Sequence, residues 1–217
     1  MGEPFVFSGF CCSPNHPAYN NGGLLHWATY GQRGGYAIRI NPHKLHLLLN
    51  GERERFPDLV CRSGCVIYSD GAAEAELKKQ YQVIASVAKE MIAALVKNEL
   101  EQVDVFRSAD PFWRVSSMLK DQYFKDEQEA RLVALVLKQG RPGNPRHKIH
   151  VRHNDGLSIP FIKLFEGILL GERCPIEAII IGPHTEKSRR ERALRSYLHG
   201  MNLGFIEVIQ SNVPYIG

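Results

Sequence analysis

Residues 120–137 read KDQYFKDEQEARLVALVL, and the second half of this stretch decides the fold around it. In an extended chain Glu127, Glu129 and Arg131 fall on one side, followed on that side by Val133 and Leu135. The pattern predicts a strand that is buried over most of its length but opens with two carboxylates and a guanidinium on one face. Because a strand is rigid, polar groups set on it form a more precise site than groups on a loop.

The charges at this strand end allow two interpretations. Two carboxylates about 7 Å apart on one face repel each other and raise one pKa, whereas Arg131 on that face favours the ionised forms. One interpretation is a solvated strand end with a salt bridge between residues two apart, which contributes little to stability. The other is an E-x-E catalytic pair formed by Glu127 and Glu129.

Length and composition indicate one globular domain over residues 1–217. The chain is 44% hydrophobic, so it can bury a sizeable core, and it carries a net charge of +4. There is no run of eighteen apolar residues and no signal-peptide pattern, so we expect a cytoplasmic protein without membrane association. The odd number of cysteines, five, favours reduced thiols over a disulfide framework.

The remaining pattern predicts an α+β fold with one mixed central sheet. A long amphipathic helix over residues 73–100 and shorter helices are expected to flank it. The predicted strands of this sheet cover residues 5–12, 36–40, 129–137, 177–181 and 204–209.

The order of the strands resembles that of mono-ADP-ribosyltransferases, in which a strand with small hydroxyl residues, here Ser8, precedes a second strand and then E-x-E. This resemblance implies NAD as the substrate, with Glu129 as the essential acid next to the ribose and Glu127 orienting or deprotonating the acceptor. An aromatic ring would stack on the nicotinamide. The candidate NAD-binding residues are Ser8, Trp27, Tyr30, Tyr36 and Arg131.

Two other ligand classes have weaker support in the sequence. A zinc site from His43, His46, Cys61 and Cys65 has unsuitable spacing, and the histidines at 147, 150 and 153 alternate between faces, so no metal is expected and a solvated basic segment is favoured there. The basic segments 141–153 and 187–195 could bind nucleic acid, although charged helix faces are usually only solvated.

Three blocks of the sequence together resemble a bacterial and phage family, domain of unknown function 2971. The blocks are Phe7-Ser8 with Trp27, Tyr30, Gly35 and YAIRI; Lys120, Phe124, Glu127, Glu129 and Arg131; and IIIGP at 179–183 with Ser211 to Tyr215. The resemblance implies a link to phage defence or mobile elements. It also implies that the chain lacks the family's N-terminal segment, which would precede Phe7.

These observations lead to one expected function and one alternative. The expectation is an ADP-ribosyltransferase-like, NAD-processing protein that modifies a macromolecular acceptor. The alternative is a non-enzymatic interaction module or a nucleic-acid-binding protein, in which Glu127, Glu129 and Arg131 form a structural salt-bridge cluster.

Overall fold

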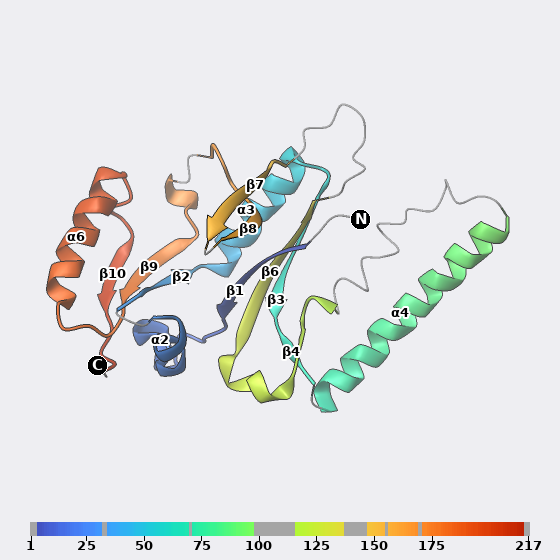
Figure 1. Ribbon diagram of the computed structural model, residues 1–217, viewed down its shortest axis with the longest axis horizontal. Helices are drawn as coiled ribbons and strands as arrows, with labels where there is room; N and C mark the ends of the chain where they lie inside the picture. Colours follow the sequence, from blue (N-terminus) through green and yellow to red (C-terminus); the bar gives the residue numbers. More distant parts are fainter. Residues whose placement is uncertain are drawn as a thin grey trace. The chain divides into compact units, whose positions relative to one another are not determined.

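The computed structural model describes residues 4–31, 34–69, 71–97, 116–136, 147–154, 156–168 and 171–214 (Figure 1). The chain divides into two compact units. The first comprises Met1–Phe5, Cys12–Cys61 and Leu135–Gly217, and the second comprises Val6–Cys11 and Arg62–Ala134.

The α+β class is confirmed, but the prediction of one central sheet is wrong. Among the described residues the predicted strands divide into two three-stranded sheets, with orders β1-β6-β3 and β10-β9-β2. Two further sheets, β4-β5 and β7-β8, have two strands each. Alternation along a sequence shows which segments are extended, but it does not show which of them pair, because pairing joins residues far apart in the chain.

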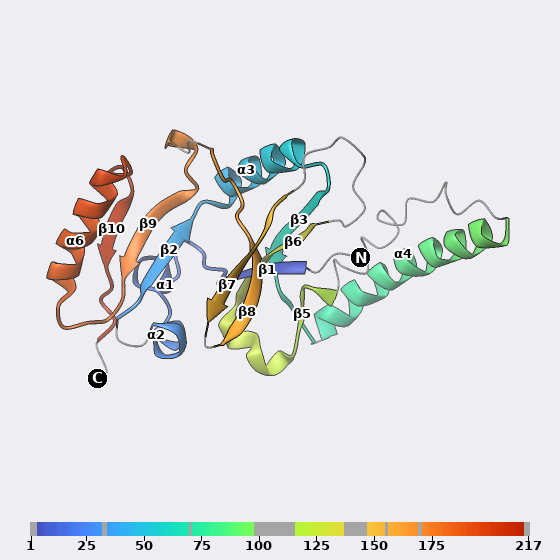
Figure 2. The same cartoon turned by 45° about the horizontal axis from the view of Figure 1, so that its top comes forward.

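The first unit is built on the sheet β10-β9-β2. β2 (Tyr36–Ile40) runs antiparallel to β9 (Ile176–Ile181), and β10 (Glu207–Gln210) runs parallel to β9 on its other side. Helix α6 (Lys187–Gly200) packs on β9 and β10 (Figure 2). The core between them contains Cys174, Ile181, Leu198, Ile206 and Val208.

Shorter elements complete the first unit. Helix α3 (Pro42–Arg55) begins where the Asn41 side chain accepts a hydrogen bond from the Lys44 N–H at 2.9 Å, and Pro42 occupies the first helical turn. The other elements are α1 (Ala18–Asn21), α2 (Leu24–Tyr30), the hairpin of β7 (Ile149–Asn154) and β8 (Leu157–Ile162), and η3 (Gly171–Arg173).

The second unit holds most of the sheet β1-β6-β3, with β6 (Glu129–Val136) between β1 (Pro4–Phe10) and β3 (Leu59–Cys65). All residues from Leu132 to Val136 are buried, as the sequence pattern predicts. β4 (Ile67–Tyr68) runs parallel to β5 (Leu119–Lys120), and the 3₁₀ helix η2 (Gln122–Glu127) follows β5 directly.

The long helix predicted over residues 73–100 is α4 (Gly71–Val96). Of its predicted apolar face, Tyr81 is 71% exposed and Ala88 is also exposed. The side chains at positions 77, 84, 87, 91 and 95 lie outside the described residues. The packing of α4 on a sheet therefore stays a prediction.

Candidate functional site

A tight turn ahead of β6 positions the acidic residues. The Asp121 side chain accepts a hydrogen bond from the Tyr123 N–H at 2.9 Å and starts the 3₁₀ helix η2. The helix ends at Glu127, and the next residue, Gln128, has a φ of 44° in the left-handed region. Glu127 therefore lies on η2, and the expectation that it shares the strand face of Glu129 is wrong, because the left-handed residue interrupts the extended chain.

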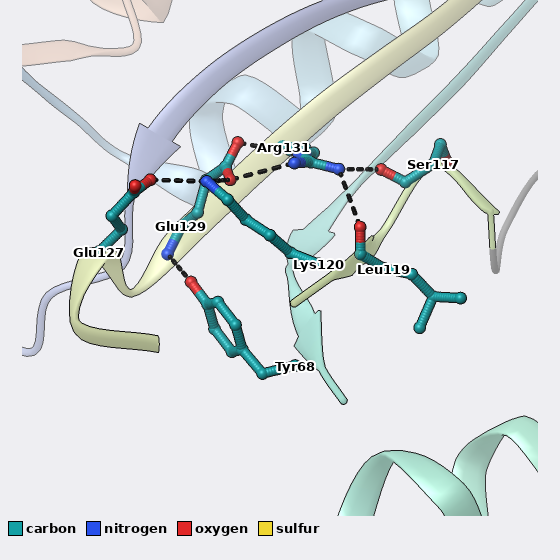
Figure 3. A network of polar contacts seen from close by, with 7 residues as sticks. All are labelled: Tyr68, Ser117, Leu119, Lys120, Glu127, Glu129 and Arg131. Carbon is teal, nitrogen blue, oxygen red and sulfur yellow. Dashed lines mark hydrogen bonds and ion pairs between the residues drawn. The ribbon is translucent and has the colours of Figure 1, made fainter. Parts of the chain in front are cut away.

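Lys120 nevertheless brings the two carboxylates together. Its Nζ lies 2.7 Å from Oε2 of Glu127 and 2.9 Å from Oε2 of Glu129, as Figure 3 shows. The same ammonium group lies 4.8 Å from the centre of the Phe124 ring, a cation–π contact that further fixes it. One cation on β5 thus bridges the end of η2 and the first residue of β6.

Arg131 holds Glu129 from the other side. Its Nε donates to Oε1 of Glu129 at 2.8 Å and its Nη2 donates to Oε2 at 3.1 Å. Its Nη1 donates to the Ser117 carbonyl at 2.7 Å (Figure 3). Residues 129 and 131 lie on one face of β6, as predicted from their spacing, and the planar guanidinium matches the carboxylate fork.

Two hydroxyl groups complete the surroundings of Glu129. The Ser8 side chain, on the neighbouring strand β1, is among the groups that lower the pKa of the Glu129 carboxyl by hydrogen bonding. The Tyr68 hydroxyl accepts a hydrogen bond from the Glu129 backbone N–H at 2.8 Å. The sheet thus brings the predicted site residues Ser8, Glu129 and Arg131 together, and Lys120 adds Glu127.

The cations decide the protonation state of Glu129. Hydrogen bonds from Arg131 are the main cause that lowers its pKa to about 2, with further hydrogen bonds from Lys120 and Ser8, against the effect of burial. The hydrogen bond to Glu127 is the main cause that raises the pKa of Lys120. Repulsion between the acids thus does not raise the pKa of Glu129, since the adjacent cations prevail.

The arrangement limits the chemistry of Glu129. A carboxylate with a pKa near 2 stays ionised at neutral pH, so Glu129 can supply a fixed charge or accept a hydrogen bond but cannot act as a general acid. It is 7% exposed, and two donors from Arg131 and one from Lys120 occupy three of its roughly four acceptor positions. A ligand hydroxyl would therefore compete with Ser8 for the remaining position.

The three aromatic candidates belong to the first unit. Trp27 is 8% exposed, and its Nε1 donates to the Asn21 carbonyl at 2.8 Å. Its ring lies so close to Gly22, Gly31 and Gly182 that a Cβ there would overlap it, which is the setting of a core residue. Tyr30 and Tyr36 are exposed, and the Arg190 guanidinium lies over the Tyr36 ring at 5.9 Å.

A second charged cluster, in the first unit, was missed. His147 is buried, so the expectation of a solvated segment is wrong at this position. Its Nε2 lies 3.0 Å from Oε1 of Glu52, which is 0% exposed and also accepts the Phe165 N–H at 3.0 Å. Arg55 completes the cluster with a contact of 3.2 Å to Oε2. Glu52 thus links α3 to two later segments.

The two basic segments predicted to bind nucleic acid are 141–153 and 187–195. Positions 141–146 lie outside the described residues. In α6, Lys187, Arg190 and Arg195 donate to the backbone carbonyls of Ser211, Gly34 and Val208. These cations therefore brace the first unit, and nucleic-acid binding stays a prediction.

Metal ligation and membrane insertion have no support in the described part of the chain. No three histidine, cysteine, aspartate or glutamate side chains gather there in a way that could hold a metal ion. Across the same residues, none of the helices combines the length and apolar character needed to cross a membrane.

Comparison with known proteins places the motif in a family. No curated protein and no solved structure matches the chain. Residues 26–132, about half of the chain, match the model of a family described as "Protein of unknown function (DUF2971)". The matched range includes Lys120, Phe124, Glu127, Glu129 and Arg131, which form one cluster in space. Over residues 26–132 the chain is a member of this family of proteins of unknown function (DUF2971).

Proposed function

We propose that this protein is an ADP-ribosyltransferase-like, NAD-processing enzyme in which Glu129 supplies the fixed negative charge next to the ribose. Cleavage of the bond between nicotinamide and ribose builds positive charge on the sugar. A preoriented carboxylate stabilises such a charge without reorganisation during the reaction. The observation that carries the proposal is the ionised Glu129 at the start of β6, held by Arg131 and Lys120, with Ser8 of the neighbouring strand β1 among the groups that lower its pKa.

The hydrogen bonds of Glu129 suggest how a substrate would enter the site. Arg131 and Lys120 are charged donors, which bind a carboxylate more strongly than a neutral hydroxyl does. The Ser8 hydroxyl is thus the donor that a ribose hydroxyl displaces at least cost, and Ser8 is exposed. The two cations stay in place and keep Glu129 ionised and oriented.

Glu127 has a different role in the proposal. Its carboxylate is more exposed than that of Glu129, 23% against 9%, while Lys120 holds both. It is therefore the acid that can meet an acceptor and orient its nucleophile. The acceptor is proposed to be a macromolecule.

One observation favours a second candidate, a non-enzymatic interaction module. The acceptor positions of Glu129 are filled by side chains of its own unit, and the cluster ties β1, β5, η2 and β6 together. In such a module the cluster would only stabilise the unit, and NAD would not bind at Glu129.

Calorimetric titration with NAD separates the two candidates. We expect the wild-type chain to bind NAD and Ser8→Ala to retain binding, because removing this hydroxyl frees an acceptor position on Glu129. Glu129→Gln should weaken binding, since it removes both the charge and one carboxylate oxygen. Glu54→Gln, which changes an exposed carboxylate on α3, is the matched control and should behave as wild type. Absence of NAD binding to the wild-type chain would refute the enzymatic proposal.

A further inference from the structure

Two cysteines of the second unit lie in direct contact. Sγ of Cys11 and Sγ of Cys65 are 2.6 Å apart, and both residues are exposed. A covalent S–S bond measures about 2.05 Å, so the two sulfur atoms need to move by only about half an ångström to bond. Cys11 directly follows β1, whereas Cys65 is the last residue of β3, so the contact joins residues 54 positions apart.

Backbone hydrogen bonds at the start of β6 bring these cysteines together. The Cys11 N–H donates to the Gln128 carbonyl at 2.7 Å, and the Val66 N–H donates to the Glu129 carbonyl at 2.8 Å. β1 and β3 lie on opposite sides of β6. The central strand β6 begins at Glu129, so it does not extend between the ends of β1 and β3 on the N-terminal side of this residue. The thiols meet across that opening.

We propose that Cys11 and Cys65 are a modification site that forms an intramolecular disulfide by exchange with a low-molecular-weight disulfide. One cysteine, as its thiolate, attacks the small disulfide, forms a mixed disulfide and releases one small thiolate. The second cysteine then attacks the protein sulfur of the mixed disulfide and releases the other small thiolate. The two cysteines are oxidised by two electrons, the small disulfide is reduced to two thiols, and the two cysteine protons pass to these thiols.

The other cysteines are less suited to this reaction. Burial raises the pKa of the Cys61 thiol to about 11 and also raises the pKa of Cys12, so both are poor sources of thiolate. The Cys12 thiol also points to the carbonyl of Ser13, at 3.5 Å. Cys174 is 1% exposed. Cys11 and Cys65 are therefore the pair that has both the close contact and the exposure that the reaction needs.

The disulfide would act on the segment that carries the acidic cluster. It would join the two outer strands at the point where Gln128 and Glu129 accept their hydrogen bonds. It would also restrict the conformations of the unfolded chain by closing a long loop, which stabilises the folded state. We therefore expect oxidation to raise the melting temperature and to slow hydrogen exchange of the Cys11 and Val66 amides.

The test counts thiols in the full chain before and after equilibration with glutathione disulfide, after unfolding in denaturant. The wild type should fall from five thiols to three, and peptide mapping should show a Cys11–Cys65 link. Cys12→Ser, the neighbouring control, should also lose two thiols, whereas Cys11→Ser and Cys65→Ser should form no intramolecular bond. The melting temperature should rise on oxidation only in the wild type and Cys12→Ser.

Several results would overturn the inference. These are an unchanged thiol count in the wild type, a stable mixed disulfide with glutathione, a link through Cys12, or a disulfide between two chains. The measurement does not involve NAD, so its outcome is independent of the proposed enzymatic function.

Discussion

Glu129 and Arg131 form a forked ion pair along one face of β6, with Nε to Oε1 at 2.8 Å and Nη2 to Oε2 at 3.1 Å. The remaining guanidinium nitrogen, Nη1, reaches the Ser117 carbonyl, so Arg131 also ties β6 to the segment before β5. The acid that the proposed function depends on is thus oriented by a residue of its own strand. This pair is the main reason that Glu129 stays ionised, and we expect it to contribute to the stability of the second unit.

Replacing Arg131 should destabilise the protein by an amount that depends on how many of its hydrogen bonds the substitute keeps. Arg131→Ala removes both hydrogen bonds of the fork from Glu129, and we expect a loss of stability of about 2–3 kcal/mol, below the value for a fully buried pair because the side chain is 19% exposed. Arg131→Lys keeps the positive charge but cannot form the two parallel hydrogen bonds to Glu129, and should lower the free energy of unfolding by about 1–2 kcal/mol. Urea unfolding of both variants provides the measurement. Equal stability of Arg131→Lys and wild type would show that the fork contributes nothing.

The lowered pKa of Glu129 predicts a specific dependence of stability on pH. The folded-state pKa of about 2 lies below the ordinary glutamate value of 4.5, so the stabilisation is fully present above 4.5 and is lost as the pH falls toward 2. Its size is at most about 3 kcal/mol, since solvent near the sheet end screens the charges. The difference in unfolding free energy between wild type and Glu129→Gln should therefore shrink between about pH 5 and pH 2. A constant difference over this range would contradict the assigned pKa.

Replacing the buried carboxylate of Glu52 should destabilise the protein more than replacing the exposed carboxylate of Glu54. The Glu52 carboxylate contacts His147, the Phe165 N–H and Arg55, and Glu52→Gln replaces one of its oxygen acceptors with an amide donor. We expect a loss of about 3 kcal/mol in the free energy of unfolding. Glu54→Gln, on the same helix but exposed, should change stability by less than about 0.5 kcal/mol. Thermal melts of the two variants compare them directly. Similar melting temperatures would mean that Glu52 does not link the segments as described.

Two glycine-to-alanine substitutions should change the stability of the protein in opposite directions. A Cβ on Gly182 would lie 2.8 Å from the Gly35 carbonyl oxygen and 2.9 Å from the Trp27 ring, so Gly182→Ala should cost about 1–3 kcal/mol. A Cβ on Gly51 meets no atom within 4 Å, and Gly51 lies inside α3. Gly51→Ala should therefore stabilise the protein by about 0.5–1 kcal/mol. Chemical unfolding of both variants tests the signs, and a stabilising Gly182→Ala would refute the described packing.

Much of the secondary structure follows from local sequence pattern. The bounds of β2, β6 and β9 agree with prediction to within one residue, because each strand alternates or is uniformly apolar. The local sequence pattern does not predict the division into two three-stranded sheets, because this division depends on which distant segments pair. The sequence pattern places the start of the extended face at Glu127, two residues early, since the left-handed conformation of Gln128 has no clear signal in a residue other than glycine.

The candidate site was predictable where its residues share the sheet. Glu129 and Arg131 lie two residues apart on one strand, and Ser8 is on the adjacent strand. The contribution of Tyr68 was missed because β4 precedes β6 by some sixty residues and carries no motif. Lys120 stood out only through the family motif, and its position between Glu127 and Glu129 depends on the η2 turn. The Glu52–His147 pair was missed for the same reason as Tyr68, as 95 residues separate its members.

The most direct test of the account is the release of nicotinamide from NAD, with water as the acceptor, by the wild-type chain and Glu129→Gln. It should be run at a temperature at which melting curves show both to be folded, with Glu54→Gln as the control. We expect turnover by the wild type and the control, and a loss on the order of 10² or more in Glu129→Gln, as for removal of a group that stabilises transition-state charge. No turnover by the wild type, or equal turnover by folded Glu129→Gln, would contradict the proposal that Glu129 acts in NAD cleavage.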